Sequence, residues 1–344
     1  MNNKKIVVIG AGKIGRSFIG QVFNRSGYEV LFVDINRSLI DQMNRVKAYR
    51  VIIKDGDKEE TVRISNIKGL CLEDEERIIE ELKHVSIVSL SVGQQGLRTA
   101  IPIIAKSLLA RRKDYGNMPL DIIIAENMRN ADFFIREELR KNLPEDYPLD
   151  QLVGLVETSI GKMVPIMTQE DIKEDPLQVF AEPYNSLIVA KKSFLNPIPE
   201  VPFLAPKENI KAWVDRKLFI HNLGHATAAY LGYQTHPDAV YISEVLDNEK
   251  LLRDVRQTML QAADILQALY PDEFTHQQLE EHIDDLLHRF RNKSLGDTLF
   301  RVGCDLYRKL SPEDRLVAPL RAALNLNKPY LLILNAIEAG ISFR

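Results

Sequence analysis

The stretch Ile6-Val7-Val8-Ile9-Gly10-Ala11-Gly12-Lys13-Ile14-Gly15 decides the fold. An apolar run of strand length leads directly into the pattern G-x-G-x-x-G, and a helical pattern continues to Asn24. The first glycine of such a turn allows a tight bend, the second lets a pyrophosphate approach the backbone, and the third permits close helix–strand packing. The helix N-terminus then offers N–H groups to the anion. We therefore expect a dinucleotide to bind along Gly10–Gly15.

An acidic residue, Asp34, ends the second expected strand, Glu29–Val33. A carboxylate at this position can accept hydrogen bonds from both ribose hydroxyls of an adenosine, and its charge repels a 2′-phosphate. The sequence therefore predicts NAD as the cofactor rather than NADP, although the cation Arg37 lies three residues beyond. The residues Ser91-Val92-Gly93 follow another apolar run and are candidates to line the same crevice. The same residues also fit a simple turn into the next helix.

The first half of the chain has the pattern of a parallel sheet. Apolar runs without alternation, such as Ser86–Leu90 and Asp121–Ile124, are typical of strands that are covered on both faces. Two further runs, Tyr49–Lys54 and Thr61–Ile67, flank the turn Asp55-Gly56-Asp57, which predicts an inserted β-hairpin.

The second half of the chain has a different pattern. Beyond the proline-rich segment Asn196–Pro202, apolar residues recur at three- and four-residue spacings, which indicates helices. We expect an α/β dinucleotide-binding domain at residues 1–196 and a helical substrate and catalytic domain at residues 197–344.

Composition excludes several classes of protein. With 45 Lys and Arg against 48 Asp and Glu, the net charge of −3 argues against a general nucleic-acid or membrane-surface binder. Two cysteines, Cys71 and Cys304, exclude a disulfide framework and a thiolate-rich zinc site, and no metal is expected. The chain shows neither a signal-peptide pattern nor a membrane-spanning run, so we expect a cytoplasmic protein. A monomer and a small homo-oligomer both remain open.

One expected helix carries an amine, an amide and an imidazole. Lys217, Asn222 and His225 share a broad face, with Asn222 about 140° and His225 about 80° from Lys217 around an α-helix. Such a set can oxidise a carbinol over a cofactor, because a desolvated lysine takes the hydroxyl proton while the other two hydrogen-bond the oxyanion. The spacing alone also fits a solvated lysine and a packed histidine. Gly224 within this helix suggests a close approach to the backbone.

The pattern Lys217-x4-Asn222-x2-His225 resembles the polyol-specific long-chain dehydrogenase/reductase family, also called the mannitol dehydrogenase family. The opening Gly10–Gly20, the stretch Ala125–Met128, and the segment from Arg301 to Leu316 are similar to its branch that acts on mannitol 1-phosphate. The resemblance implies a zinc-independent enzyme with a Rossmann-type NAD-binding domain, an all-helical C-terminal domain and a site between them.

The resemblance also implies roles for particular residues. Lys217 would be the general base, and Asn222 and His225 would hold the reacting oxygen. Asn127, Arg301 and Lys309 match family positions near the substrate. Together with Lys309, the guanidinium groups of Arg301 and Arg308 form a cationic set suited to a phosphate, and on one helix their seven-residue spacing would put them on one side.

The chain departs from the family at Ile160-Gly161-Lys162-Met163, where the family usually has an aspartate–arginine pair. Gly161 supplies no carboxylate, and Lys162 keeps the charge without a fork of donors. Glu157 stands where relatives commonly carry an aspartate. The exact substrate therefore stays open.

Four functions are consistent with these patterns. The first is NAD-dependent interconversion of mannitol 1-phosphate and fructose 6-phosphate. The second is the same chemistry on an unphosphorylated polyol or a hexuronate. The third is a catalytically silent NAD(H)-binding sensor, and the fourth is an opine-type dehydrogenase, against which the asparagine between Lys217 and His225 argues.

Overall fold

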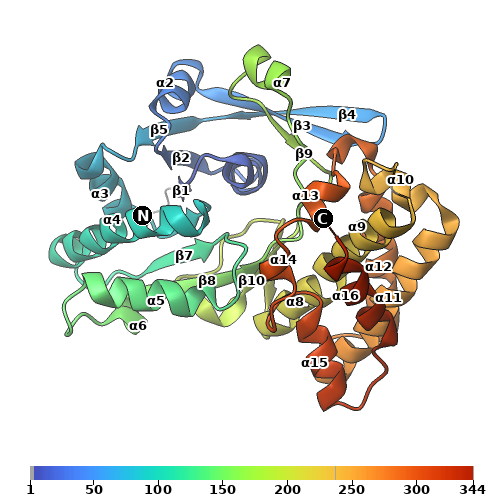
Figure 1. The fold of residues 1–344 in the computed structure, drawn as a ribbon. Helices are drawn as coiled ribbons and strands as arrows, with labels where there is room; N and C mark the ends of the chain where they lie inside the picture. The colour runs from blue at the N-terminus through green and yellow to red at the C-terminus, as the bar shows by residue number, and fades with distance from the viewer. Residues whose placement is uncertain (1–3, 237, 344) are drawn as a thin grey trace. The chain divides into compact units, whose positions relative to one another are not determined.

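The computed structural model describes residues 4–236 and 238–343, which divide into two compact units (Figure 1). The first unit runs from the N-terminal end to Lys54 and from Lys58 to Ile210. The second unit contains Asp55–Asp57 and the chain from Lys211 onward. In the part of the chain so described, no helix is both long and apolar enough to cross a bilayer.

The main sheet of the first unit has the strand order β11-β10-β8-β7-β6-β1-β2-β5. Its strands are β1 (Lys5–Ile9), β2 (Glu29–Asp34), β5 (Ile67–Cys71), β6 (Ile87–Leu90), β7 (Leu120–Ile124), β8 (Val153–Ser159), β10 (Leu187–Ala190) and β11 (Leu204–Lys207). From β8 to β5 every pairing is parallel, whereas β10 pairs antiparallel to β8. The predicted parallel sheet is confirmed.

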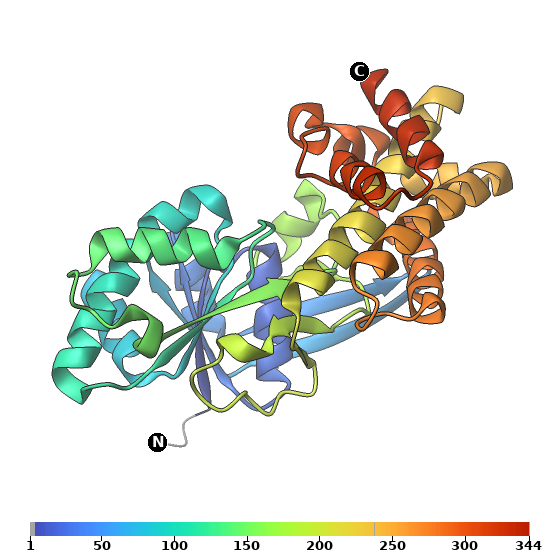
Figure 2. The same cartoon turned by 90° about the horizontal axis from the view of Figure 1, so that it is seen from below.

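Helices cover both faces of this sheet, and the teal and green helices occupy one face in Figure 2. That face is covered by α3 (Glu75–His84), α4 (Gly93–Tyr115) and α5 (Ala131–Asn142), and the other by η1 (Gly15–Gly20) and α1 (Gln21–Asn24). Along β1, Val7 and Ile9 join the first core and Ile6 and Val8 join the second. Because β1 is buried on both sides, its sequence is apolar throughout.

The remaining helices of this unit are α2 (Arg37–Val46), α6 (Leu149–Leu152), α7 (Gln169–Glu174) and the 3₁₀ turn η2 (Lys191–Ser193). A second sheet contains the expected hairpin. Its strands β3 (Ala48–Asp55) and β4 (Lys58–Ser65) are neighbours, and β9 (Val179–Ala181) pairs with β3. Gly56 turns the hairpin with a φ of 59°, a conformation that glycine adopts without strain.

The second unit is helical, as predicted, and Figure 1 shows its helices in yellow to red. They are α8 (Ile210–Arg216), η3 (Lys217–Asn222), α9 (Leu223–Thr235), α10 (Ile242–Asp247), α11 (Glu249–Leu269), α12 (His276–Phe290), η4 (Lys293–Leu295), α13 (Leu299–Gly303), α14 (Leu306–Lys309), α15 (Val317–Asn325) and α16 (Leu331–Ile341). The helix α9 packs against α11, α13 and α16, so it forms the centre of the unit. Gly224 lies at one such contact, because an added Cβ would come 2.5 Å from Sδ of Met259.

The two units divide after Ile210, later than the boundary expected between residues 196 and 197. The reason is that β11 pairs with β10 and so extends the sheet of the first unit beyond the proline-rich segment. Pro206 is tolerated in β11 because this is the edge strand of the sheet.

Two glycines of the first turn provide a matched pair of substitutions. An added Cβ on Gly15 would lie 1.9 Å from the carbonyl oxygen of Gly10, whereas one on Gly12 would meet nothing within 4 Å. Gly15→Ala is therefore expected to destabilise the protein by about 1–3 kcal/mol, and Gly12→Ala by less than about 1 kcal/mol. Thermal or urea denaturation measures both, and equal stabilities would contradict the close helix–strand contact at Gly15.

Candidate functional site

The glycine-rich turn opens a cavity at the carboxyl edge of the parallel sheet. Gly10 has a φ of 102°, and its N–H donates to the carbonyl of Val33 over 2.7 Å. The cavity has a volume of about 370 Å³. It is lined by Ile9, Gly10, Gly12, Val33, Asp34, Ile35, Leu72, Ser91, Val92, Gln95, Gly96, Thr99 and Ala100. The predicted cofactor residues Gly10, Gly12, Asp34, Ser91 and Val92 thus surround one space.

A buried arginine fixes the turn from behind. Nε of Arg16 donates to the carbonyl of Ala11 over 2.7 Å, and its Nη1 donates to the carbonyl of Leu177, also over 2.7 Å. The carbonyl of Arg16 in turn accepts a hydrogen bond from the hydroxyl of Tyr49 at 2.7 Å. The role of Arg16 could not be predicted from the sequence, because its partner Leu177 is 161 residues away along the chain.

The carboxylate of Asp34 joins the end of β2 to the glycine turn. Its Oδ2 accepts a hydrogen bond from the N–H of Ala11 at 2.7 Å, and its Oδ1 accepts from the N–H of Asn36 at 2.9 Å. The side chain is therefore held at the cavity wall, where the ribose of an adenosine would lie in a Rossmann-type fold. The nearby cation Arg37 forms an ion pair with Glu73 at 2.8 Å.

Two glutamates accept hydrogen bonds from the N-termini of α4 and α5. Oε1 of Glu126 accepts from the N–H groups of Val92 and Gly93, at 2.7 and 3.0 Å, where α4 begins. Glu157, at the end of β8, accepts from the backbone of Asn130 and Ala131 where α5 begins, and burial raises its pKa to about 7. The predicted cofactor residue Gly93 therefore bonds to Glu126, and the predicted substrate residue Asn127 lies exposed beside that glutamate.

Lys162 is buried within the first unit. Its Nζ donates to the carbonyls of Glu182 and Tyr184 and to Oδ1 of Asn185, over 3.0, 2.8 and 2.6 Å. These three oxygens satisfy the ammonium group of Lys162, which stands where the family usually has an arginine. The lysine therefore connects its own loop to the loop of residues 182–185. An added Cβ on Gly161 would lie 3.7 Å from Tyr184, an ordinary contact.

In the second unit, Lys217 and Asn222 are the two ends of a π-helix, η3. Its N–H groups bond to carbonyls five residues earlier, as from Leu223 to Leu218. Residues five apart therefore stand about one turn apart, on one face. The predicted angle of about 140° between Lys217 and Asn222 is wrong, because it assumed α-helical geometry. His225 follows Asn222 by three residues, a spacing that keeps it on the same side.

Lys217 has the electrostatics of a base. The pKa of its amine is lowered to about 8, mainly by burial and also by the cation Arg315, while the carboxylate of Asp314 acts in the opposite direction. Nε of Arg315 donates to Oδ1 of Asp314 over 2.8 Å. From the sequence, Arg315 and Asp314 are noted only as part of the segment that resembles the family. Their electrostatic effect on Lys217 could not be predicted, because they lie far from it along the chain.

The imidazole of His225 is packed on two sides. Its ring stacks on Phe290, with centroids 4.6 Å apart and an interplanar angle of 8°. Its Nε2 lies 3.2 Å from Oδ2 of Asp297, a buried carboxylate that also forms an ion pair with Arg301. Burial lowers the pKa of the neighbouring His221 well below its usual range, and this ring packs edge-on to Phe290.

The cations expected to hold a phosphate do not share a helix. Asp305, with a φ of 66°, separates α13 from α14, so the expectation that Arg301 and Arg308 lie on one side of a helix is wrong. Arg308 donates to Asp305 over 2.5 Å and to Asp314 over 3.1 Å. Lys309 is buried, donates to the carbonyl of Val302 over 2.5 Å, and has its pKa lowered to about 8 by burial and by Arg315.

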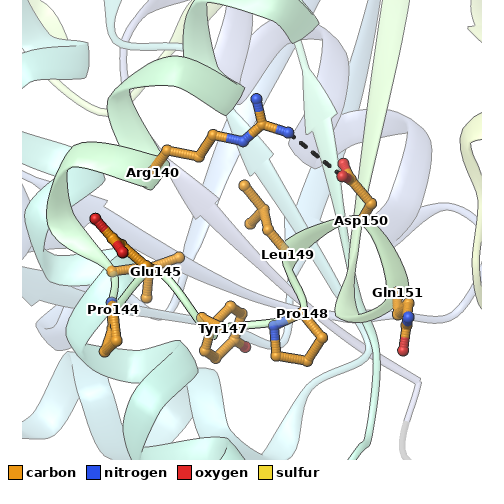
Figure 3. A pocket seen from close by; sticks show the side chains of 9 residues that line it. Arg140, Pro144, Glu145, Tyr147, Pro148, Leu149, Asp150 and Gln151 are labelled. Carbon is orange, nitrogen blue, oxygen red and sulfur yellow. Dashed lines mark hydrogen bonds and ion pairs between the residues drawn. The ribbon is translucent and has the colours of Figure 1, made fainter.

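A second cavity of about 420 Å³ lies at the end of α5 and is drawn in Figure 3. Its lining residues are Arg140, Leu143, Pro144, Glu145, Tyr147, Pro148, Leu149, Asp150 and Gln151. Arg140 pairs with Asp150 across it at 3.4 Å and with Glu137 at 3.1 Å. Its charged groups thus largely neutralise one another, and the predicted site residues lie elsewhere.

Both units match models of one protein family. The model of the mannitol dehydrogenase Rossmann domain matches residues 4–202, and that of the mannitol dehydrogenase C-terminal domain matches residues 209–344. The chain belongs to the mannitol dehydrogenase family. The resemblance predicted from the glycine turn and the Lys217–His225 pattern is therefore confirmed.

Within the mannitol dehydrogenase family, the chain is 31% identical over 342 residues to mannitol-1-phosphate 5-dehydrogenase of Halalkalibacterium halodurans, covering 98% of this chain and 88% of the relative. The fold is similar to that of Pseudomonas fluorescens mannitol 2-dehydrogenase, solved as a ternary complex with NAD and D-mannitol. The TM-score is 0.77 at 17% identity, over 98% of this chain and 78% of that one. An octopine dehydrogenase solved with NADH and pyruvate is less similar, with a TM-score of 0.54 at 12% identity, over 98% of this chain and 88% of that one.

Proposed function

We propose that this member of the mannitol dehydrogenase family is an NAD-dependent dehydrogenase that interconverts mannitol 1-phosphate and fructose 6-phosphate by hydride transfer. The observation that carries the chemistry is the face formed by Lys217, Asn222 and His225, whose lysine has a pKa of about 8. The name of the Halalkalibacterium halodurans relative supports the choice of substrate.

The residues of the first unit fit a dinucleotide. Gly12 is exposed with open space around the position of a Cβ, so a pyrophosphate can approach its backbone. The N-terminus of the first helix lacks a side-chain cap among the described residues, which leaves its N–H groups to an anion. Asp34 would hold the adenosine ribose, and Ser91 and Val92 would line the other wall of the cavity.

The second unit supplies the proton chemistry. In oxidation, the neutral amine of Lys217 takes the proton of the substrate hydroxyl, while Asn222 and His225 hydrogen-bond the oxygen as it gains negative charge. The hydride would leave the carbon that bears this hydroxyl, which becomes the ketone carbon, and NAD would supply the acceptor when bound. In reduction, the ammonium of Lys217 returns the proton to the oxygen. We also place this reaction in the cytoplasm, where NAD and sugar phosphates are available.

The same chemistry on an unphosphorylated polyol is a second candidate. The observation that favours it is the pairing of Arg308 with two carboxylates, which already neutralise its guanidinium. A screen of NADH oxidation with fructose 6-phosphate, fructose and fructuronate separates these possibilities. Turnover with fructose 6-phosphate alone supports the proposal, and binding of NADH without turnover on any ketose would contradict an enzymatic role.

Lys217→Ala is expected to lower kcat by about 10²- to 10⁴-fold and to leave the Kd for NADH within about twofold, because the amine moves a proton and does not hold the cofactor. In the wild type, the oxidation rate should rise with pH through about 8, as the amine loses its proton. The reduction rate should fall over the same range. The exposed Lys211 of the preceding helix is the control, and Lys211→Ala should match the wild type. Near-normal turnover of Lys217→Ala would remove this lysine from the mechanism.

Asp34→Ala is expected to narrow the preference for NAD over NADP, because the 2′-phosphate of NADP no longer meets a like charge. The ratio of kcat/KM for the two cofactors measures this effect. Asp41, an exposed acid on α2, is the matched control, and Asp41→Ala should leave the ratio unchanged. A wild-type preference for NADP would overturn the assignment of Asp34.

Arg308→Ala is expected to raise KM for fructose 6-phosphate by about tenfold to a hundredfold, the loss typical of a charge-assisted contact. Any activity on fructose should barely change, since that substrate lacks the phosphate. Steady-state kinetics on both ketoses test this expectation. An equal loss on both would show that Arg308 acts through its ion pairs with Asp305 and Asp314 instead.

A further inference from the structure

Asp297 is a buried carboxylate between two residues of the candidate site. Its side chain is 5% exposed, and its Oδ2 lies 3.2 Å from Nε2 of His225. Its other oxygen, Oδ1, pairs with the guanidinium of Arg301. A carboxylate buried to this degree is stable in its charged form only with cations or N–H donors around it, and His225 and Arg301 are placed to supply them.

The backbone around Asp297 is held as firmly as its side chain. Its carbonyl accepts a hydrogen bond from the N–H of Ile242 at 2.9 Å, where α10 begins. The next residue, Thr298, forms a β-bridge with Tyr241 and caps α13 through its hydroxyl. The backbone that carries this carboxylate is therefore fixed between α10 and α13, which holds the carboxylate close to His225.

Two contacts together define the orientation of the His225 ring. Stacking on Phe290, with the planes 8° apart, sets the plane of the imidazole. Stacking alone leaves the ring free to flip about its Cβ–Cγ bond, which would exchange Nε2 for a carbon. The carboxylate of Asp297 removes that freedom, because it attracts an N–H more strongly than a C–H.

The same contact selects the tautomer. An ionised carboxylate only accepts hydrogen bonds, so it favours a proton on the nitrogen that faces it. We propose that Asp297 is a positioning residue that keeps a proton on Nε2 of His225 and thereby presents Nδ1 to the substrate oxygen, while its second oxygen orients Arg301. With Nε2 protonated, donation from Nδ1 to an oxyanion requires the imidazolium, and Asp297 stabilises that charge.

The catalytic part of this inference rests on the proposed function, but the tautomer does not. Selective ¹⁵N labelling of the seven histidines, with the His225 signal assigned by its loss in His225→Gln, reports which ring nitrogen is protonated. The wild type should show a protonated Nε2. A wild-type spectrum with a bare Nε2 and a protonated Nδ1 would overturn the proposal without any variant.

Asp297→Asn tests the role of the charge. Its amide can donate to Nε2, so the ¹⁵N shifts of His225 should move toward the other tautomer. The kcat on the ketose that the wild type reduces should fall by about tenfold to a hundredfold, with the Kd for NADH unchanged. Asp247→Asn is the control, because Asp247 is a partly exposed acid paired with Arg291 and Lys293.

The ¹⁵N spectra test the tautomer of His225 and the kinetics test the proposed function, so each can be refuted without the other. Unchanged ¹⁵N shifts in a folded Asp297→Asn variant would refute the inference, whatever the turnover. Shifts that move in a protein inactive on every ketose would uphold the tautomer and refute the proposed function. A loss of kcat accompanied by an equal loss in Asp247→Asn would show a general structural effect and would also count against Asp297.

Discussion

The burial of β1 on both faces is the constraint from which the rest of the first unit follows. A strand in that position must be apolar throughout and must be flanked by parallel neighbours whose return helices cover the sheet. All of those neighbours then end at one edge. Each of five polar or turn residues lies at or near the carboxyl end of a different strand of this parallel group, namely Gly10, Asp34, Ser91, Glu126 and Glu157. The parallel topology therefore brings these residues to the same edge of the sheet. Their side chains determine what each position along that edge can bind.

The second unit obtains its order from hydrogen-bond register instead of from a sheet. A single stretch of i→i+5 bonding in η3 brings the amine of Lys217 and the amide of Asn222 to one side of the helix. Normal α-helical bonding resumes in α9, whose small residues allow α11, α13 and α16 to approach closely. Packing around α9 partly buries Lys217 and the ring of His225, and burial is the main cause of the lowered pKa of Lys217.

Features that depend on neighbours along the chain could be predicted from the sequence. The glycine turn, Asp34 and the hairpin at Gly56 are local patterns. Features that depend on distant partners could not. The strand β8 lacks a continuous apolar run, because Gly154 and Glu157 interrupt it. The left-handed conformation of Asp305, which separates α13 from α14, has no signal in the residue itself. The contact between Asp297 and His225 spans 72 residues, and the three oxygens around Lys162 come from a loop about twenty residues away.

The two glutamates at the starts of α4 and α5 have a consequence for ligand choice. The N-terminus of each helix in a parallel α/β unit can bind a phosphate through its free N–H groups. A sheet of this kind therefore has several possible phosphate sites along one edge. At two of them the backbone N–H groups are already bonded to carboxyl groups of the protein, those of Glu126 and Glu157. A diffusing nucleotide therefore finds the backbone donors at those two positions already engaged, whereas Gly12 of the glycine turn is exposed. In this way the two glutamates favour binding of a nucleotide phosphate at the glycine turn over binding at the starts of α4 and α5.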